Sequence, residues 1–125
     1  MRLLLVLVCC WFMPLQAAVD VEKTMKNMGF EFKQAIDSSD SATLVTHLNE
    51  LIRLTQQAQQ GAFPADKAEQ FQQGLTEVLA ELEKAQQAAV EGNLQQARQH
   101  LRQVDSLRKD YHKLRKVSFW QLLFG

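Results

Sequence analysis

The stretch that decides the fold lies in the second half of the chain, where residues 68–97 read AEQFQQGLTEVLAELEKAQQAAVEGNLQQA. Apolar or small residues recur there at spacings of three and four, the period of an α-helix that buries one face. They are Ala68, Phe71, Leu75, Val78, Leu82, Ala85 and Ala89. Glu91-Gly92-Asn93 then interrupts the pattern, because Gly92 suits a left-handed helix end and Asn93 suits the cap of a new helix. The stretch therefore predicts two helices joined by a tight turn.

Three more stripes of the same period lie on either side of this third stripe. The first is Val21, Met25, Met28, Phe32 and Ala35; the second is Leu44, Leu48, Leu51, Thr55 and Ala58; the fourth is Leu94, Ala97, Leu101, Val104, Arg108 and Tyr111. No stretch alternates with period two, so we expect no strand. Residues 37–41 offer capping side chains for the second helix, Gly61 suits its end, and Pro64 suits the start of the third. Because every connection is short, the pattern predicts an all-α, antiparallel up-down-up-down four-helix bundle.

The N-terminal residues 1–17 have the pattern of a secretory signal peptide. Arg2 precedes a short apolar run, and Ala17 offers a small residue at the cut. The remaining 108 of the 125 residues suit one domain, which we divide into a bundle over residues 18–116 and an apolar C-terminal extension over residues 117–125. We expect a secreted protein.

The composition after residue 17 excludes several classes of function. No cysteine remains, so neither a disulfide nor a zinc–thiolate site is expected. Without Arg2 there are 13 basic and 14 acidic residues, a formal charge of −1, which argues against nucleic-acid binding. There is no HExxH motif, phosphate loop or nucleophile paired with a base, so we expect no hydrolytic activity.

One pair of residues suggests a cofactor. In the predicted topology Met25, early in the first helix, and His112, late in the fourth, lie at the same end of the bundle. A thioether and an imidazole that face each other across a core can hold a haem iron. His100 is about 18 Å from His112 along the helix axis, and His47 also lies elsewhere; we expect both at the surface.

Arg108 stands one turn before His112 and interrupts an apolar stripe. A buried arginine needs a counter-charge, which a haem propionate would supply. Each residue also has a plainer interpretation: Met25 as packing, His112 as a solvated cation at a helix end, and Arg108 as a side chain that reaches solvent. Gly29 and Gly74, inside helices, indicate either close backbone packing or room for a bulky ligand.

Several motifs resemble the soluble cytochrome b562 family. They are Val19–Met25, the Phe71-Gln72-Gln73-Gly74 stretch, Glu91–Ala97, and the Arg108–His112 segment, which matches an RxxYH ending. The resemblance runs from about Val19 to Arg115. It implies a periplasmic one-electron carrier with one non-covalent haem b per chain, six-coordinate through Met25 and His112, with unidentified redox proteins as donor and acceptor.

Two features depart from the family pattern. The link around Gly61–Ala65 is short, which bears on how far a haem would be exposed, and residues 117–125 add an apolar tail. The tail suits packing or self-association, or contact with a membrane surface. Two rival functions stay open: a haem-free periplasmic helical bundle that binds or chaperones a partner, and a copper or other metal site using Met25, Met28 and His112.

Overall fold

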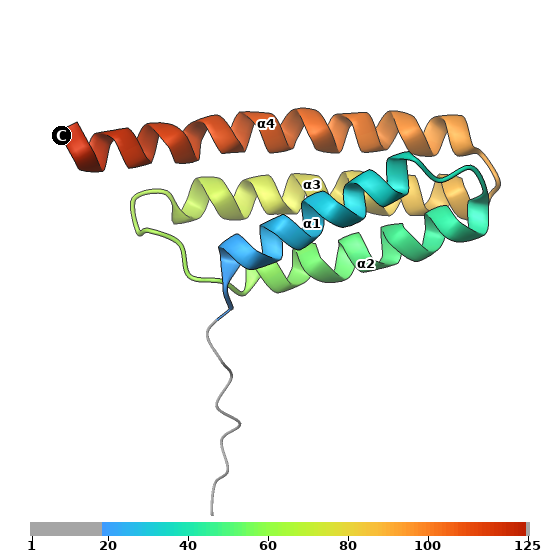
Figure 1. The fold of residues 1–125 in the computed structure, drawn as a ribbon, viewed down its shortest axis with the longest axis horizontal. Helices are drawn as coiled ribbons and strands as arrows, with labels where there is room; N and C mark the ends of the chain where they lie inside the picture. The colour runs from blue at the N-terminus through green and yellow to red at the C-terminus, as the bar shows by residue number, and fades with distance from the viewer. Residues whose placement is uncertain (1–18, 125) are drawn as a thin grey trace, which may run out of the picture.

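The computed structural model describes the backbone of residues 19–124 and the side chains of residues 19–111 and 113. Its helices are α1 (Val21–Ile36), α2 (Ser41–Gln59), α3 (Ala68–Val90) and α4 (Leu94–Phe124). They run alternately up and down (Figure 1), and the described residues contain no strand. The predicted all-α up-down-up-down bundle is confirmed. The expected signal peptide, residues 1–17, lies outside the described residues.

The helices that border the two tightest connections are capped by side chains. Asp40 Oδ1 accepts a hydrogen bond from the Thr43 backbone N at 2.8 Å and so caps α2. Gly92 has a φ of +82°, and Asn93 Oδ1 accepts a bond from the backbone N of Gln96 at 3.1 Å. The turn predicted at Gly92-Asn93 is therefore confirmed, and its left-handed residue is the one that glycine favours.

The link between α2 and α3 differs in detail from the prediction. Gly61 follows the end of α2 without a positive φ; a Cβ at this position would instead collide with the Val21 side chain. Pro64 does not begin α3, which starts at Ala68. The carbonyl of Pro64 accepts a bond from the Lys67 backbone N at 2.9 Å, so the proline sits in a turn that precedes the helix.

The two halves of the bundle differ in packing. We call the half that holds residues 37–40 and 91–93 the closed half, and the half that holds the start of α1 and residues 60–67 the open half. The closed half contains most of the fully buried side chains, among them Leu44, Leu48 and Leu101. In the open half the stripe residues Met25 and Met28 are only half-buried.

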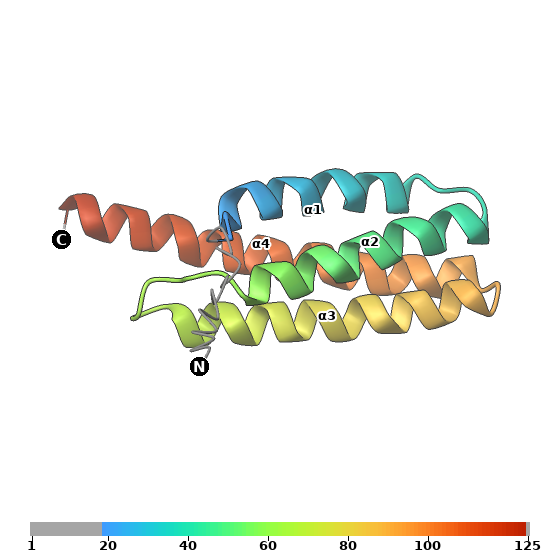
Figure 2. The ribbon, with the colours of Figure 1, turned by 90° about the horizontal axis from the view of Figure 1, so that it is seen from below.

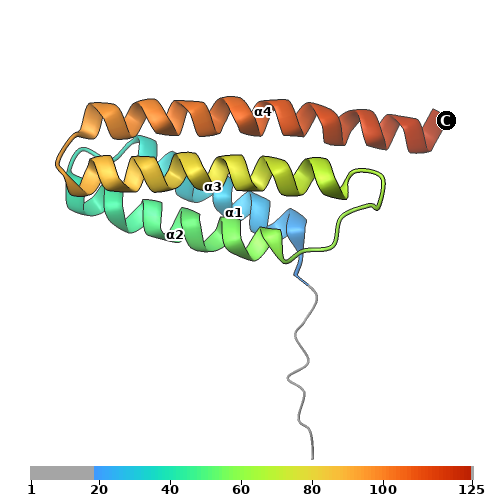
Figure 3. The ribbon, with the colours of Figure 1, turned by 180° about the vertical axis from the view of Figure 1, so that it is seen from behind.

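Neighbouring helices pack in chain order, α1 on α2, α2 on α3 and α3 on α4, whereas α1 and α4 hardly touch. Figure 2 shows these neighbours from a second direction. The C-terminal part of α4 continues past the ends of the other helices (Figures 1 and 3). No helix in the described part of the chain is both long and apolar enough to cross a bilayer.

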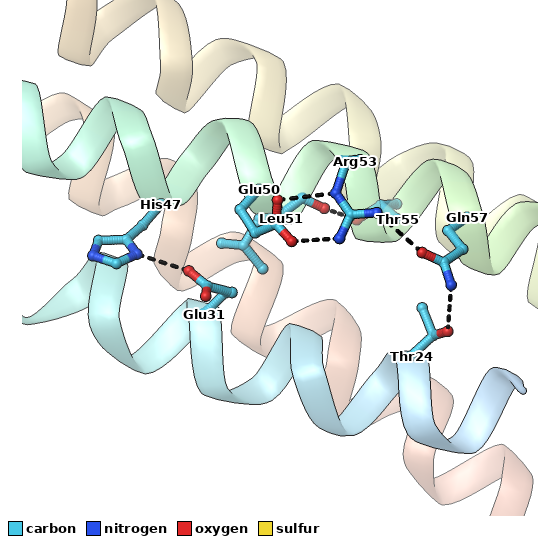
Figure 4. A network of polar contacts seen from close by, with 8 residues as sticks. All are labelled: Thr24, Glu31, His47, Glu50, Leu51, Arg53, Thr55 and Gln57. Atoms are coloured by element: carbon cyan, nitrogen blue, oxygen red, sulfur yellow. Dashed lines mark hydrogen bonds and ion pairs between the residues drawn. The ribbon is translucent and has the colours of Figure 1, made fainter.

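Two histidines lie between helices of the closed half. His47 Nδ1 is 2.7 Å from Glu31 Oε2 and joins α2 to α1 (Figure 4), and His100 Nδ1 is 2.7 Å from Glu81 Oε2 and joins α4 to α3. Both histidine side chains are about three-quarters buried, with exposed fractions of 25% and 24%. The expectation of two surface histidines therefore missed these pairings across helix interfaces.

Candidate functional site

A cavity of about 420 Å³ lies in the open half, on the side where α1 and α4 hardly touch. Its volume falls within the range typical of small-molecule and cofactor sites. The wall is largely apolar and includes Met25, Met28 and Phe32 from α1, Leu51 from α2, Phe71, Leu75 and Val78 from α3, and Val104 from α4. This wall suits a bulky, mostly apolar ligand.

Met25 is where the sequence predicts it, half-buried on the inner face of α1 and in the cavity wall. Met28, one turn further along α1, lines the same cavity. Thioether sulfurs are soft ligands and bind haem iron but not hard cations such as Mg²⁺. No group of three or more His, Cys, Asp or Glu that could hold a metal ion occurs among the described residues. The soft metal ligands in this wall are therefore the two thioethers, and Glu22 adds one carboxylate.

Arg108 also lines the cavity, but its side chain is 59% exposed and its charge already has a partner. Its Nε and Nη2 donate to Asp105 Oδ1 at 3.1 and 2.9 Å. Hydrogen bonds from Lys109 and then from Arg108 lower the pKa of Asp105, so this carboxylate holds both cations at the surface of α4. A guanidinium has five N–H donors, and these bonds leave Nη1 for an anionic group at the cavity edge.

Lys26, on α1, is a second cation in the cavity wall, and it is exposed like Arg108. The two cations come from the two helices that flank the open side of the bundle. Exposed lysine and arginine place their charged ends at solvent while their stems cover apolar surface. The exposed carboxylate of Glu22, on α1, lines the cavity as well. The cavity therefore combines an apolar interior with two cations and one anion among its exposed residues, which suits a ligand that has an apolar body and a charged edge.

His112 follows Tyr111 in α4, and its side chain lies outside the described residues. Tyr111 itself lines the cavity and rests on Gly74 of α3: a Cβ at Gly74 would lie 2.5 and 2.6 Å from Cε2 and Cε1 of the ring. Burial raises the pKa of Tyr111, and the charges of Glu77 and Asp110 raise it further. For Gly74, the structure favours close packing over spare room. Gly29 differs, because a Cβ there would meet nothing within 4 Å.

The link from residue 60 to residue 67 packs behind the cavity wall, a contact that periodicity could not reveal. The Phe63 ring stacks on Phe71 with centroids 5.2 Å apart, and Phe71 forms part of the cavity wall. Gln72 Nε2 donates to the Gln59 carbonyl at 2.8 Å, which ties α3 to the end of α2. A phenylalanine within a short Gly/Pro-containing link was the available signal for this contact.

Thr24, next to Met25, is a second residue that the stripe pattern missed. Its side chain is only 3% exposed, and its Oγ1 accepts a bond from Gln57 Nε2 at 3.4 Å (Figure 4). The bond joins α1 to α2 beside the candidate ligand. Packing of α1 on α2 therefore sets the position of Met25 in the absence of strong contacts between α1 and α4.

Comparison with known proteins identifies the family of the chain. A sequence model of the cytochrome b562 family matches residues 20–116, which span α1 to α3 and the part of α4 that carries Arg108 and His112. Comparison with curated proteins finds no relative of significant similarity. The family match implies a haem-binding, electron-carrying helical bundle with b-type haem. The chain belongs to the cytochrome b562 family.

Proposed function

We propose that this protein is a periplasmic b-type cytochrome that carries one electron at a time, with one non-covalent haem held between Met25 and His112. The observation that carries the proposal is the apolar cavity of the open half, which has Met25 and Arg108 in its wall. The helix α4, which bears His112, extends past the end of the bundle at which α1 begins (Figure 3), and Met25 lies in the first turns of α1. Bound haem would supply a one-electron couple whose potential its ligands and surroundings tune.

The residues of this chain would hold and shield the cofactor. Met25 offers a sulfur from α1, and His112 would offer a ring nitrogen from α4. Phe71 and Leu75 exclude water from the side of α3, where they are 8% and 7% exposed. Arg108 Nη1 and Lys26 would bind the propionates where the cavity meets solvent.

Two protein ligands would fill both axial positions of the iron, so we propose a carrier and not an enzyme. Covalent attachment is not expected, because Arg108 and Tyr111 stand four and one residues before His112, where a Cys-x-x-Cys-His motif needs cysteines. The donor and acceptor proteins would dock at the cavity mouth, near Lys26 and Arg108. The apolar residues 117–125 support self-association or contact with a membrane surface, which gel filtration with and without lipid vesicles would separate.

The test is the reduced-minus-oxidised visible spectrum of the periplasmic fraction of cells that express the full chain. We expect sharp b-type bands that Met25→Ala and His112→Ala each abolish or shift. His100→Ala is the matched control, because this histidine lies on the same helix, pairs with Glu81 and is not in the cavity wall. It should leave the bands unchanged.

A colourless protein that takes up no haem when haem is supplied would contradict the proposal and favour the haem-free binding module. Bands found only in the cytoplasmic fraction would overturn the periplasmic assignment and leave the haem assignment standing. Bands that survive in both Met25→Ala and His112→Ala would place the iron on other ligands.

A further inference from the structure

We propose that the contact between Gly74 and Tyr111 positions the end of α4 for haem binding, with Tyr111 as a positioning residue. This inference rests on the proposed function, because it concerns the placement of position 112, the proposed axial ligand. Because Gly74 has no side chain, an aromatic ring from α4 can lie directly against the backbone of α3.

The geometry leaves no room for a side chain at position 74. Gly74 is buried, and a Cβ there would lie 2.5 and 2.6 Å from two carbons of the Tyr111 ring, far inside ordinary contact distances of 3.4–4 Å. Gly29 lines the same cavity and is also inside a helix, yet a Cβ there would meet nothing within 4 Å. Of these two glycines, therefore, only Gly74 is required by packing.

The Gly74–Tyr111 contact matters because few other contacts hold α4 in the open half. At the open half α4 is held by α3 and hardly touches α1, so its placement depends on contacts with α3. Arg108, Lys109, Asp110 and Lys113 are exposed, and Tyr111 is the last partly buried residue among those of α4 whose side chains are described. The ring is therefore the final anchor of α4 in the described part of the chain.

Because α4 is a regular helix, fixing Tyr111 also fixes the backbone of the next residue, His112. Successive residues of an α-helix differ by a rotation of about 100° and a rise of about 1.5 Å, so fixing Tyr111 on Gly74 also fixes the direction and height of position 112. A metal ligand must lie within about 0.2 Å of its preferred distance from the metal, and a rotation of α4 would spoil that placement.

The experiment is a double-mutant cycle on haem binding, read by absorbance titration of the haem-free full chain. Gly74→Ala should weaken haem binding by about tenfold or more and increase the high-spin fraction of the bound haem, because the new methyl group displaces the ring. Tyr111→Ala should also weaken binding, since α4 loses its anchor, whereas Tyr111→Phe keeps the ring and should restore the affinity. Thr76→Ala, an exposed position on α3, is the control for alanine substitution and should bind haem like the unmodified chain.

The double variant decides between two roles of Gly74. If the ring is what position 74 accommodates, adding Gly74→Ala to Tyr111→Ala should cost little further affinity. An equal cost in both backgrounds would mean that Gly74 makes room for the haem itself, and the positioning proposal would be overturned. Gly74→Ala with unaltered affinity and spectrum would overturn it as well.

A parallel cycle on urea unfolding of the haem-free chain separates this proposal from the proposed function. If the unmodified chain binds no haem, the electron-carrier proposal fails, and so does positioning for a haem ligand, although coupling in the unfolding cycle would still show the Gly74–Tyr111 contact. If the unmodified chain binds haem but neither cycle shows coupling, the positioning proposal alone fails. Circular dichroism identifies any variant that has simply lost its helices.

Discussion

The closed and open halves of the bundle are built from the same stripe pattern but pack differently. In the closed half, stripe residues such as Leu48, Ala85 and Leu101 are fully buried, with 0% exposure. In the open half, Met25 and Tyr111 occupy equivalent stripe positions and are only partly buried around a cavity. A stripe of apolar residues therefore indicates which face of a helix points inward, but it does not indicate whether protein alone fills the space behind that face.

An apolar cavity with a soft sulfur donor has a physical cost in the absence of a ligand, because its wall forgoes dispersion contacts. The closed half shows that this chain can pack small and large residues tightly where nothing needs to bind. The cavity of the open half is the one difference in packing between the halves that a bound ligand would remove.

The largest effect is expected from removing a core side chain of the closed half. Leu48→Ala should lower the free energy of unfolding of the haem-free protein by about 2–5 kcal/mol, because the cavity it leaves is surrounded by packed side chains. Met28→Ala should cost about 1 kcal/mol or less, because its side chain is half-buried beside a space that already exists. Urea denaturation measures both, and equal costs would mean that the two halves are packed alike.

Haem loading should stabilise mainly the open half. At a free haem concentration of about 100 times Kd, linkage adds about 2.7 kcal/mol to the folded state. Amide hydrogen exchange should therefore slow most in the first turns of α1 and in α4 beyond Val104. Residues near the 91–93 turn serve as the internal reference. If haem slowed amide exchange equally in both halves, a ligand confined to the open half would be contradicted.

Two glycine-to-alanine substitutions should change the stability of the haem-free protein in opposite directions. Gly92→Ala places a Cβ in the left-handed conformation of the closed-half turn and should destabilise the protein by about 1–2 kcal/mol. Gly29→Ala, in the open half, should stabilise α1 by up to about 1 kcal/mol, because alanine favours helix and its Cβ meets nothing. Thermal unfolding of the pair tests this, and destabilisation by Gly29→Ala would reveal a contact that the structure lacks.

The smallest effect concerns pH and the pairing of Glu81 with His100 in the closed half. Burial alone would raise the pKa of Glu81, but the hydrogen bond from His100 and the charge of Lys84 outweigh it and hold the pKa below its ordinary value of 4.5. A carboxyl whose pKa is lowered by folding stabilises the protein above its unfolded pKa, and this stability is lost as the pH falls through the lower folded value.

Replacing this carboxylate should therefore matter only when it is ionised. Glu81→Gln should reduce stability at neutral pH, and the difference from the unmodified chain should disappear as the pH drops below about 4.5 and through the folded pKa. Glu83→Gln, exposed on the same helix, controls for the loss of charge. Urea midpoints across this pH range measure both variants, and a difference that persists at low pH would attribute the effect to packing.

Much of the fold could be predicted from the sequence because helix period and turn residues act locally. The stripes and the Gly92-Asn93 turn each depend on neighbours within a few positions. The contacts of Phe63 with Phe71 and of Gly61 with Val21 depend on how a link returns to the bundle, which no local pattern encodes. Arg108 was expected to need a ligand for its charge, but Asp105, one turn away, already answers it.

The most direct test of the haem assignment is the proton NMR spectrum of the reduced, haem-loaded protein. The methyl protons of an axial methionine lie over the porphyrin, and its ring current shifts them far upfield. We expect one such three-proton resonance, present in the unmodified chain and in Met28→Ala and absent in Met25→Ala. A resonance that persists in Met25→Ala, or none at all in the unmodified chain, would contradict axial ligation by Met25.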